Sequence, residues 1–158
     1  MKRHIRTASP DDFETLVAID QSCFDEGVAY NEYEFRYFMA QNRATTLVAE
    51  VDGSIAGFLL LDIGRPPSGA TLVTLDVKHI FRKAGIASEL LLHSEEVLAT
   101  HGITRYRLQV DTTNSAAFEF YKRRGFRIVR TLRHYYPNSA DAYLMEKRLG
   151  TRTLLPDS

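Results

Sequence analysis

Residues 82–87, Arg-Lys-Ala-Gly-Ile-Ala, have the composition of a site that binds phosphate. They follow an apolar run at residues 71–77 and open a second run with helical spacing. The first amides of a helix have no partner within the helix, and the helix dipole adds partial positive charge there. Gly85 lets a ligand approach the main chain closely, and Arg82 and Lys83 add full positive charges. The segment therefore predicts a polyphosphate site built largely from main-chain amides.

Three sequence blocks narrow the choice of polyphosphate. Neither G-x-x-x-x-G-K-[ST] nor a G-x-G-x-x-G after the first strand occurs, so the P-loop and dinucleotide fingerprints are excluded. Residues 82–87 fit R-x-x-G-x-A, which resembles the pyrophosphate-binding turn of the GNAT superfamily of acyl-CoA N-acetyltransferases. Residues 114–126 fit N-x-x-A-x-x-x-Y-x-x-x-G-F, which resembles the second hallmark of that superfamily. Residues 133–145 combine Tyr-Tyr-Pro with Asp-Ala-Tyr-x-Met and resemble the protein N-terminal acetyltransferases, particularly the bacterial enzyme that acetylates the N-terminal alanine of a ribosomal protein.

The resemblance implies that acetyl-CoA lies in a gap between the strands at 71–77 and 105–111. The main chain of residues 75–77 would line the pantetheine arm, and an N–H there would polarise the thioester oxygen. Tyr121 would protonate the departing thiolate, although a tyrosine beside two phenylalanines also fits an aromatic core. The residues expected to contact acetyl-CoA are Leu75, Asp76, Val77, Arg82, Lys83, Ala84, Gly85, Ile86, Ala87, Ser88, Asn114 and Tyr121.

One position departs from the pattern of the ribosomal-protein enzyme. Five residues before Asn114, where that enzyme has a glutamate as general base, this chain has Gln109, which cannot take up a proton. Asp111, on the same strand face, and Asp76 are alternative bases, and water relayed to solvent is a third possibility. Acetylation of an α-amine depends least on a general base, because a pKa near 8 leaves about a tenth of the amine neutral at pH 7. Deprotonating it there costs ~1.4 kcal/mol. A lysine amine with a pKa near 10.4 would cost ~4–5 kcal/mol.

Aromatic residues mark the expected acceptor side. Tyr30, in the loop of residues 25–30, and Tyr135 and Tyr136, in the third block, would shape the entry of the amine. We expect an acetyl-CoA-dependent N-acetyltransferase in which the amine attacks the thioester directly, without a covalent enzyme intermediate. The favoured acceptor is the N-terminal α-amine of a protein. Two interpretations stay open beside it: acetylation of a small amine (a polyamine, amino acid or aminoglycoside), and a degenerate acyl-CoA-binding regulatory module, which Gln109 favours and Tyr121 disfavours.

The overall composition fits a soluble protein of the cytoplasm. The 158 residues include 20 basic and 20 acidic side chains, so the net charge indicates neither a nucleic-acid nor a membrane partner. No apolar run reaches the ~18 residues of a membrane span, and residues 1–12 lack the apolar core of a signal peptide. Cys23 is the single cysteine, which excludes an internal disulfide, and its place on an apolar helix face predicts packing rather than nucleophilic catalysis. We expect no metal, and a monomer or homodimer.

Regular elements must hold the chemical groups in place. Asp52-Gly53 between two apolar runs predicts a hairpin, and residues 9–12, Ser-Pro-Asp-Asp, predict a helix start. The strand, helix and strand over residues 71–111 should form a right-handed parallel crossover. The resemblance implies an α/β (α+β) GNAT fold: a mixed, mostly antiparallel sheet of six to seven strands with about four helices, in one domain over residues 1–150 followed by a flexible tail at 151–158. The expected strands are 4–7, 45–51, 54–62, 71–77, 105–111, 126–133 and 141–148, and the expected helices are 10–24, 31–39, 85–100 and 114–124.

Overall fold

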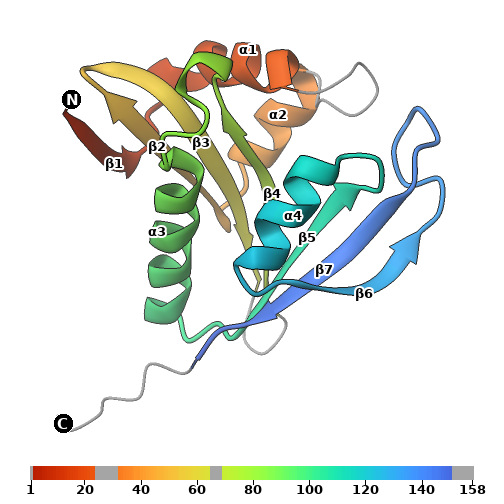
Figure 1. Cartoon of the computed structure of the whole chain (residues 1–158). Coiled ribbons are helices and arrows are strands. Elements are labelled where there is room, and N and C mark those ends of the chain that lie inside the picture. Colours follow the sequence, from red (N-terminus) through yellow and green to blue (C-terminus); the bar gives the residue numbers. More distant parts are fainter. Residues whose placement is uncertain (1, 24–31, 65–68, 151–158) are drawn as a thin grey trace, which may run out of the picture.

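The computed structural model describes residues 2–23, 32–64 and 69–150 (Figure 1). The expectations for Tyr30 and its loop, and for the tail at 151–158, lie outside these residues. None of the helices in the three described ranges is long and apolar enough to cross a membrane. The same ranges contain no group of three or more His, Cys, Asp or Glu side chains arranged to hold a metal ion.

Within these described ranges, seven strands form one mixed sheet in the order β1-β2-β3-β4-β5-β7-β6. Only the neighbours β4 and β5 run parallel, and the other pairs are antiparallel, which confirms the expected sheet. Asp52 and Gly53 join β2 to β3 with positive φ angles of 51° and 84°, as a two-residue hairpin of type I′ requires. The strands are β1 (Arg3–Thr7), β2 (Ala44–Val51), β3 (Ser54–Ile63), β4 (Ala70–Val77), β5 (Arg105–Asp111), β6 (Arg127–Leu132) and β7 (Ala142–Arg148).

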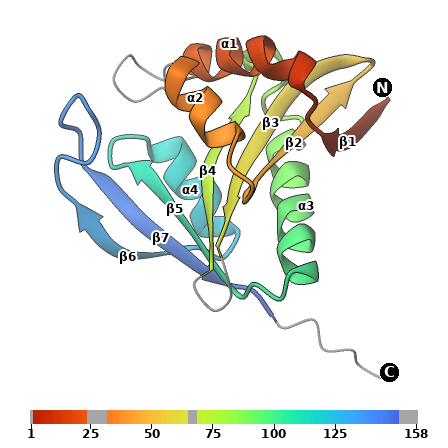
Figure 2. The same ribbon diagram turned by 180° about the vertical axis from the view of Figure 1, so that it is seen from behind.

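Helices cover both faces of the sheet. α1 (Phe13–Cys23) and α2 (Glu32–Met39) lie on one face, and α3 (Ile86–Thr100) and α4 (Ser115–Arg123) lie on the other (Figures 1 and 2). Short 3-10 helices, η1 (Pro10–Asp12) and η2 (His79–Phe81), precede α1 and α3. The helix start expected at residues 9–12 is present, with Ser9 as N-cap and Pro10 as the first residue, but its first turn is the 3-10 helix η1 and the α-helix begins at Phe13.

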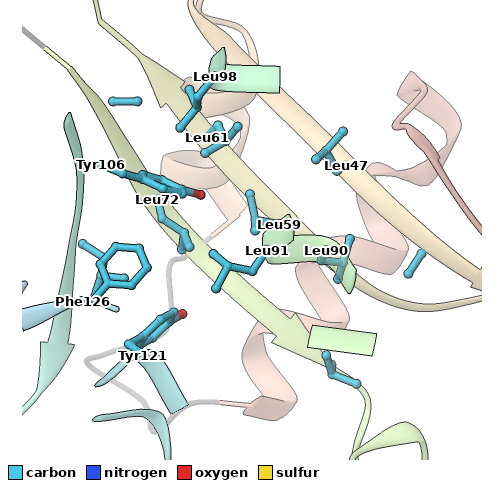
Figure 3. Close-up of a cluster of buried hydrophobic side chains, with 14 of the residues drawn as sticks. Leu47, Leu59, Leu61, Leu72, Leu90, Leu91, Leu98, Tyr106, Tyr121 and Phe126 are labelled. Carbon is cyan, nitrogen blue, oxygen red and sulfur yellow. The ribbon is translucent and has the colours of Figure 1, made fainter. Parts of the chain in front are cut away.

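Two hydrophobic clusters fill the space between the sheet and its helices. Beneath α3 and α4, the rings of Tyr106, Tyr121 and Phe126 meet edge to face, with centroids 5.5 Å and 5.6 Å apart (Figure 3). Leu98 of α3 is fully buried there, whereas its neighbour Val97 is only partly buried. The cluster beneath α1 and α2 contains Leu16, Val17, Ile19, Phe35, Val48, Phe58 and Leu60.

The contact between β4 and β5 is short. Residues 70–72 of β4 pair with residues 106–108 of β5, and beyond these three pairs the strands diverge. β3 continues to pair with β4 as far as Val77, so β4 is left open only on its β5 side. The splay expected between residues 71–77 and 105–111 is thus confirmed, and Figure 1 shows α4 lying in front of it.

A bulge in β4 changes which side chains face α1. The register of the β3–β4 ladder shifts between Leu60 and Leu61, which leaves Val73 as an extra residue without a partner in β3. From that point, Thr74 and Asp76 lie opposite residues of the cluster beneath α1. Directly opposed residues share a face of the sheet, so the bulge turns these two polar side chains toward α1.

Candidate active site

A cavity of about 400 Å³ opens between the diverging ends of β4 and β5. Its walls come from α1, β4, β5, α4, the start of α3 and the loop of residues 133–141 between β6 and β7. It brings together residues that are far apart in the sequence. The lining residues are Asp20, Cys23, 72–77, Arg82, Ala87, 109–111, Asn114, Ala116, Ala117, Phe120, Tyr121, Tyr135 and Tyr136.

The turn between η2 and α3 presents free main-chain N–H groups. The amides of residues 83–88 donate to no oxygen of the described residues, and the first main-chain bond of α3 runs from the Glu89 N–H to the Gly85 oxygen at 3.0 Å. Lys83 and Gly85 both have positive φ angles, 64° and 83°, which fold the turn tightly against the helix start. Several free donors at the positive end of a helix form a candidate anion site.

Two arginines from other elements brace this turn. Arg3 of β1 donates from its two terminal nitrogens to the Ala84 oxygen at 2.6 Å and 2.9 Å. Arg124, just after α4, donates from Nε to Ser88 Oγ at 3.1 Å and stacks on the Phe120 ring, 3.8 Å from its centroid. The sequence reasoning missed Arg124, because only the packing of α4 beside α3 brings it to the turn. The sequence feature that could have indicated Arg124 is its position directly before the Gly-Phe of the second block.

The open edge of β4 presents main-chain groups to the cavity. The Val77 oxygen accepts a hydrogen bond from Arg82 Nε at 3.2 Å, so it points away from β3. Main-chain groups of alternate residues point the same way along a strand, and those of Leu75 therefore also face the gap. The Asp76 oxygen points toward β3, where a Cβ added at Gly57 would lie only 2.6 Å from it. An extended ligand can pair with this free edge as an additional strand does.

α4 carries the two polar residues of the second block. Asn114 is its N-cap and accepts the Ala117 N–H at 3.1 Å through Oδ1, which leaves its amide N–H groups for other partners. Tyr121 lines the cavity and is only 8% exposed. Its burial raises the pKa of the phenol, and the charge of Asp76 raises it further, so the group keeps its proton at neutral pH. The ring also packs on Phe126, so Tyr121 belongs to the core as well as to the cavity.

Two candidate base positions lie on β5. Gln109 and Asp111 both line the cavity. The Oδ1 atom of Asp111 accepts the N–H of Thr113 at 2.9 Å and its hydroxyl at 2.8 Å. This carboxylate therefore holds the turn into α4, while Gln109 contributes a neutral amide.

A buried pair of carboxyl groups lies on the α1 side of the cavity. Thr74 Oγ1 is 2.5 Å from Asp76 Oδ1 and 3.3 Å from Asp20 Oδ1. Burial raises the pKa of Asp76 well above its usual range, and a hydrogen bond and the charge of Asp20 raise it further. Asp20 was missed from the sequence. The sequence feature that could have indicated Asp20 is a charged residue between apolar positions of the helix. In the structure Asp20 is 0% exposed.

The loop of residues 133–141 brings two tyrosines to the cavity. Tyr135 and Tyr136 meet edge to face with ring centroids 4.9 Å apart. The Tyr136 N–H donates to the Ala140 oxygen at 3.1 Å, which closes the loop on itself. Burial raises the pKa of both phenols, so both keep their protons at neutral pH.

Comparison with known proteins identifies the family of the chain. The sequence profile of the acetyltransferase (GNAT) family matches residues 13–126. The chain belongs to this family. It is 31% identical over 152 residues to an N-alpha-acetyltransferase of Sulfurisphaera tokodaii, covering 89% of this chain and 90% of that protein. The structure of Ard1 from Thermoplasma volcanium matches it with a TM-score of 0.87 at 28% identity, covering 95% of this chain and 99% of that one. The ribosomal-protein alanine N-acetyltransferase of Escherichia coli shares the fold, with a TM-score of 0.84 at 23% identity over 97% of this chain and 99% of that one.

In this GNAT chain, the residues expected to contact acetyl-CoA fall into two groups. The cavity is lined by Leu75, Asp76, Val77, Arg82, Ala87, Asn114 and Tyr121. The adjoining turn and the first residues of α3 hold the others, Lys83, Ala84, Gly85, Ile86 and Ser88. Ile86 is 2% exposed, so its side chain belongs to the core and only its amide can face a ligand. Cys23, expected only to pack, also lines the cavity and donates from Sγ to the Val77 oxygen at 3.5 Å.

Proposed function

We propose that this GNAT protein transfers the acetyl group of acetyl-CoA to the N-terminal α-amine of a protein. One observation carries the proposal: the open edge of β4 leads directly into the turn whose amides are free. An extended pantetheine arm that ends in a pyrophosphate suits this succession of strand edge and helix start. The relative from Sulfurisphaera tokodaii carries the name N-alpha-acetyltransferase, which supports an α-amine as the acceptor.

The proposed roles follow the two halves of the cavity. The amides of residues 83–88, with Arg82 and Arg124, would take the pyrophosphate, and the main chain of residues 75–77 would take the pantetheine. The Leu75 N–H, which faces the gap, would polarise the thioester oxygen. Tyr121 would then give its proton to the departing thiolate.

The acceptor would enter from the side of the β6–β7 loop. Tyr135 and Tyr136 line the cavity there and would frame the first residues of a peptide. The amine would attack the thioester directly, because the lining side chains in the described residues offer Cys23 as the only thiol and engage it with the Val77 oxygen. One sheet runs from Arg3 to Arg148, and we infer that residues 1–150 act as a single catalytic domain.

Acetylation of synthetic substrates tests the proposal. Short peptides with different first residues and a free N-terminus would be incubated with acetyl-CoA, and the products located by mass spectrometry. The matched control is the same peptide with a blocked N-terminus and one lysine, because a lysine amine costs ~3 kcal/mol more to deprotonate at pH 7. We expect acetylation of the free α-amine and none of the blocked peptide.

A parallel panel separates the other acceptor classes. Spermidine, free amino acids and an aminoglycoside would be assayed under the same conditions. Turnover of one of these with no turnover of any peptide would replace the proposed acceptor by a small amine. Tight binding of acetyl-CoA without turnover of any amine would instead identify a regulatory acyl-CoA-binding module.

A further inference from the structure

The contacts of Thr74 indicate that the buried carboxyl pair shares a proton. A threonine hydroxyl has one hydrogen to donate, yet Thr74 Oγ1 lies within hydrogen-bond distance of both Asp20 and Asp76. A proton on one of the two carboxyl groups, donated to the hydroxyl oxygen, satisfies the second contact. All three side chains are almost fully buried, at 0%, 5% and 1% exposure for Asp20, Thr74 and Asp76. Two like charges so close and so dry do not both ionise, which agrees with a shared proton.

One atom of the pair has no partner and belongs to a residue that lines the cavity. Asp76 Oδ2 is buried and makes no hydrogen bond within the described residues, while its neighbour Oδ1 is held by Thr74. An unsatisfied buried acceptor is costly, and in native proteins an ordered water, an ion, a ligand or a reaction accounts for such an atom. The only cation among the described lining residues, Arg82, donates from Nε to the Val77 oxygen. The other titratable groups of the lining are Asp20, Cys23, Asp111, Tyr121, Tyr135 and Tyr136.

We propose that the carboxyl pair of Asp20 and Asp76, with Oδ2 of Asp76 as the receiving atom, takes the proton from the ammonium group of the acceptor. The inference deepens the proposed function and rests on it. It assigns the task that Gln109 cannot perform to the opposite wall of the cavity, where the bulge at Val73 turns Asp76 toward α1.

The protons balance in this scheme. The pair begins with one proton and one negative charge, and it becomes neutral when Asp76 accepts a proton from the ammonium group. The free amine then attacks the thioester carbon, the C–N bond forms, and the C–S bond breaks. Tyr121 gives its proton to the thiolate and regains one from the new amide nitrogen, and the pair later releases its proton to water. Burial, the main cause of the raised pKa of Asp76, favours this uptake, because a neutral carboxyl pair is less costly to bury than a charged one.

Asp76→Asn tests the inference through its pH profile. The variant keeps the shape of the side chain and removes its basicity, so peptide kcat/KM at pH 7 should fall by ~10²-fold. The loss of kcat/KM should become smaller toward pH 9, where more of the α-amine is already neutral without an enzyme base. Acetyl-CoA affinity should not change. Asp11→Asn, which removes an exposed carboxylate of η1, is the matched control and should keep the wild-type profile.

Stability measures the raised pKa of Asp76 independently of activity. The pKa of Asp76 is raised on folding above its ordinary value near 3.8, so the group stabilises the fold below that pH and loses this contribution as the pH rises through its folded pKa. Asparagine does not titrate. Asp76→Asn should therefore melt higher than the wild type at pH 8, and this gain should shrink toward pH 4.

Asp20→Asn provides a second variant. It removes the carboxyl group that shares the proton with Asp76, so the acidic limb of the pH profile should move. Wild-type kcat/KM in Asp76→Asn at pH 7, or an equal loss at every pH, would overturn the inference, and so would a profile unmoved in Asp20→Asn. If the wild type acetylates a small amine instead of peptides, the proposed acceptor fails while the same profiles, measured with that amine, still decide the role of the pair. If it acetylates no amine, both fail.

Discussion

Gly85 offers a sharp test of the phosphate turn, because α3 has a second glycine of similar geometry at its other end. Gly85 precedes the helix with φ 83°, and Gly102 follows it with φ 70°. A Cβ at Gly85 would approach only Arg3, at 3.7 Å, and one at Gly102 would meet nothing within 4 Å. Alanine at either position therefore creates no steric clash, and only its left-handed backbone conformation destabilises the fold.

The two substitutions should cost the same stability and differ in binding. The left-handed region costs an alanine ~1–2 kcal/mol, partly offset by ~0.4–1 kcal/mol from the stiffer unfolded chain. A net cost of about 1 kcal/mol lowers the melting temperature of a chain of this size by roughly 2–4 °C. Relaxing Gly85 would also rotate the peptide units that carry the free amides. Charge-assisted hydrogen bonds are worth ~1.5–3 kcal/mol each, so losing one should weaken acetyl-CoA binding at least tenfold.

Calorimetric titration of acetyl-CoA into Gly85→Ala and Gly102→Ala, with melting curves of both, makes the comparison. We expect matched melting temperatures and a loss of affinity confined to Gly85→Ala. Wild-type affinity for acetyl-CoA in Gly85→Ala would refute the assignment of the turn to phosphate. An equal loss of affinity in both variants would mean that α3 as a whole had moved.

Three further substitutions test single roles. Tyr121→Phe keeps the ring against Phe126 and deletes the hydroxyl, so kcat should fall ~10²-fold at unchanged acetyl-CoA affinity; a change below twofold would remove Tyr121 as the acid. Arg124→Gln should weaken acetyl-CoA binding several-fold in calorimetry, whereas Arg123→Gln, its exposed neighbour, should not; a similar effect of both would indicate only general charge. Tyr136→Ala should raise the peptide KM and leave acetyl-CoA affinity alone, and the opposite pattern in steady-state kinetics would place Tyr136 on the cofactor side.

Local patterns predicted the elements and the placing of the motifs. The alternation of residues 105–111 and the Asp52-Gly53 turn are local signals, and they gave strands and a hairpin at the right positions. The helix start at residues 9–12 was also found, although its first turn is a 3-10 helix. The Asp12 carboxylate that accepts from Ser9 there also accepts from the guanidinium of Arg6, 2.8 Å away. That ion pair joins η1 to β1 and is not visible in a local pattern.

The missed parts of the candidate site depend on tertiary packing. Asp20 meets Asp76 only because the bulge at Val73 reverses which side chains of β4 face α1. No residue type in that strand predicts a bulge. Arg124 reaches Ser88 only because α4 packs beside α3. The sequence indicated which residues carry chemistry wherever a motif fixed their spacing. It did not indicate which distant side chain would lie opposite them.

The short pairing of β4 with β5 also bears on how the protein behaves without its co-substrate. Unpaired strand edges invite another chain to add to the sheet, and proteins usually cover them. Here the two edges face each other across a gap that α4 covers on one side, and a bound thioester arm would occupy the remaining length. We therefore expect the free protein to associate slowly through this opening during storage and acetyl-CoA to suppress that association. The ligand would thus act on solubility as well as on catalysis.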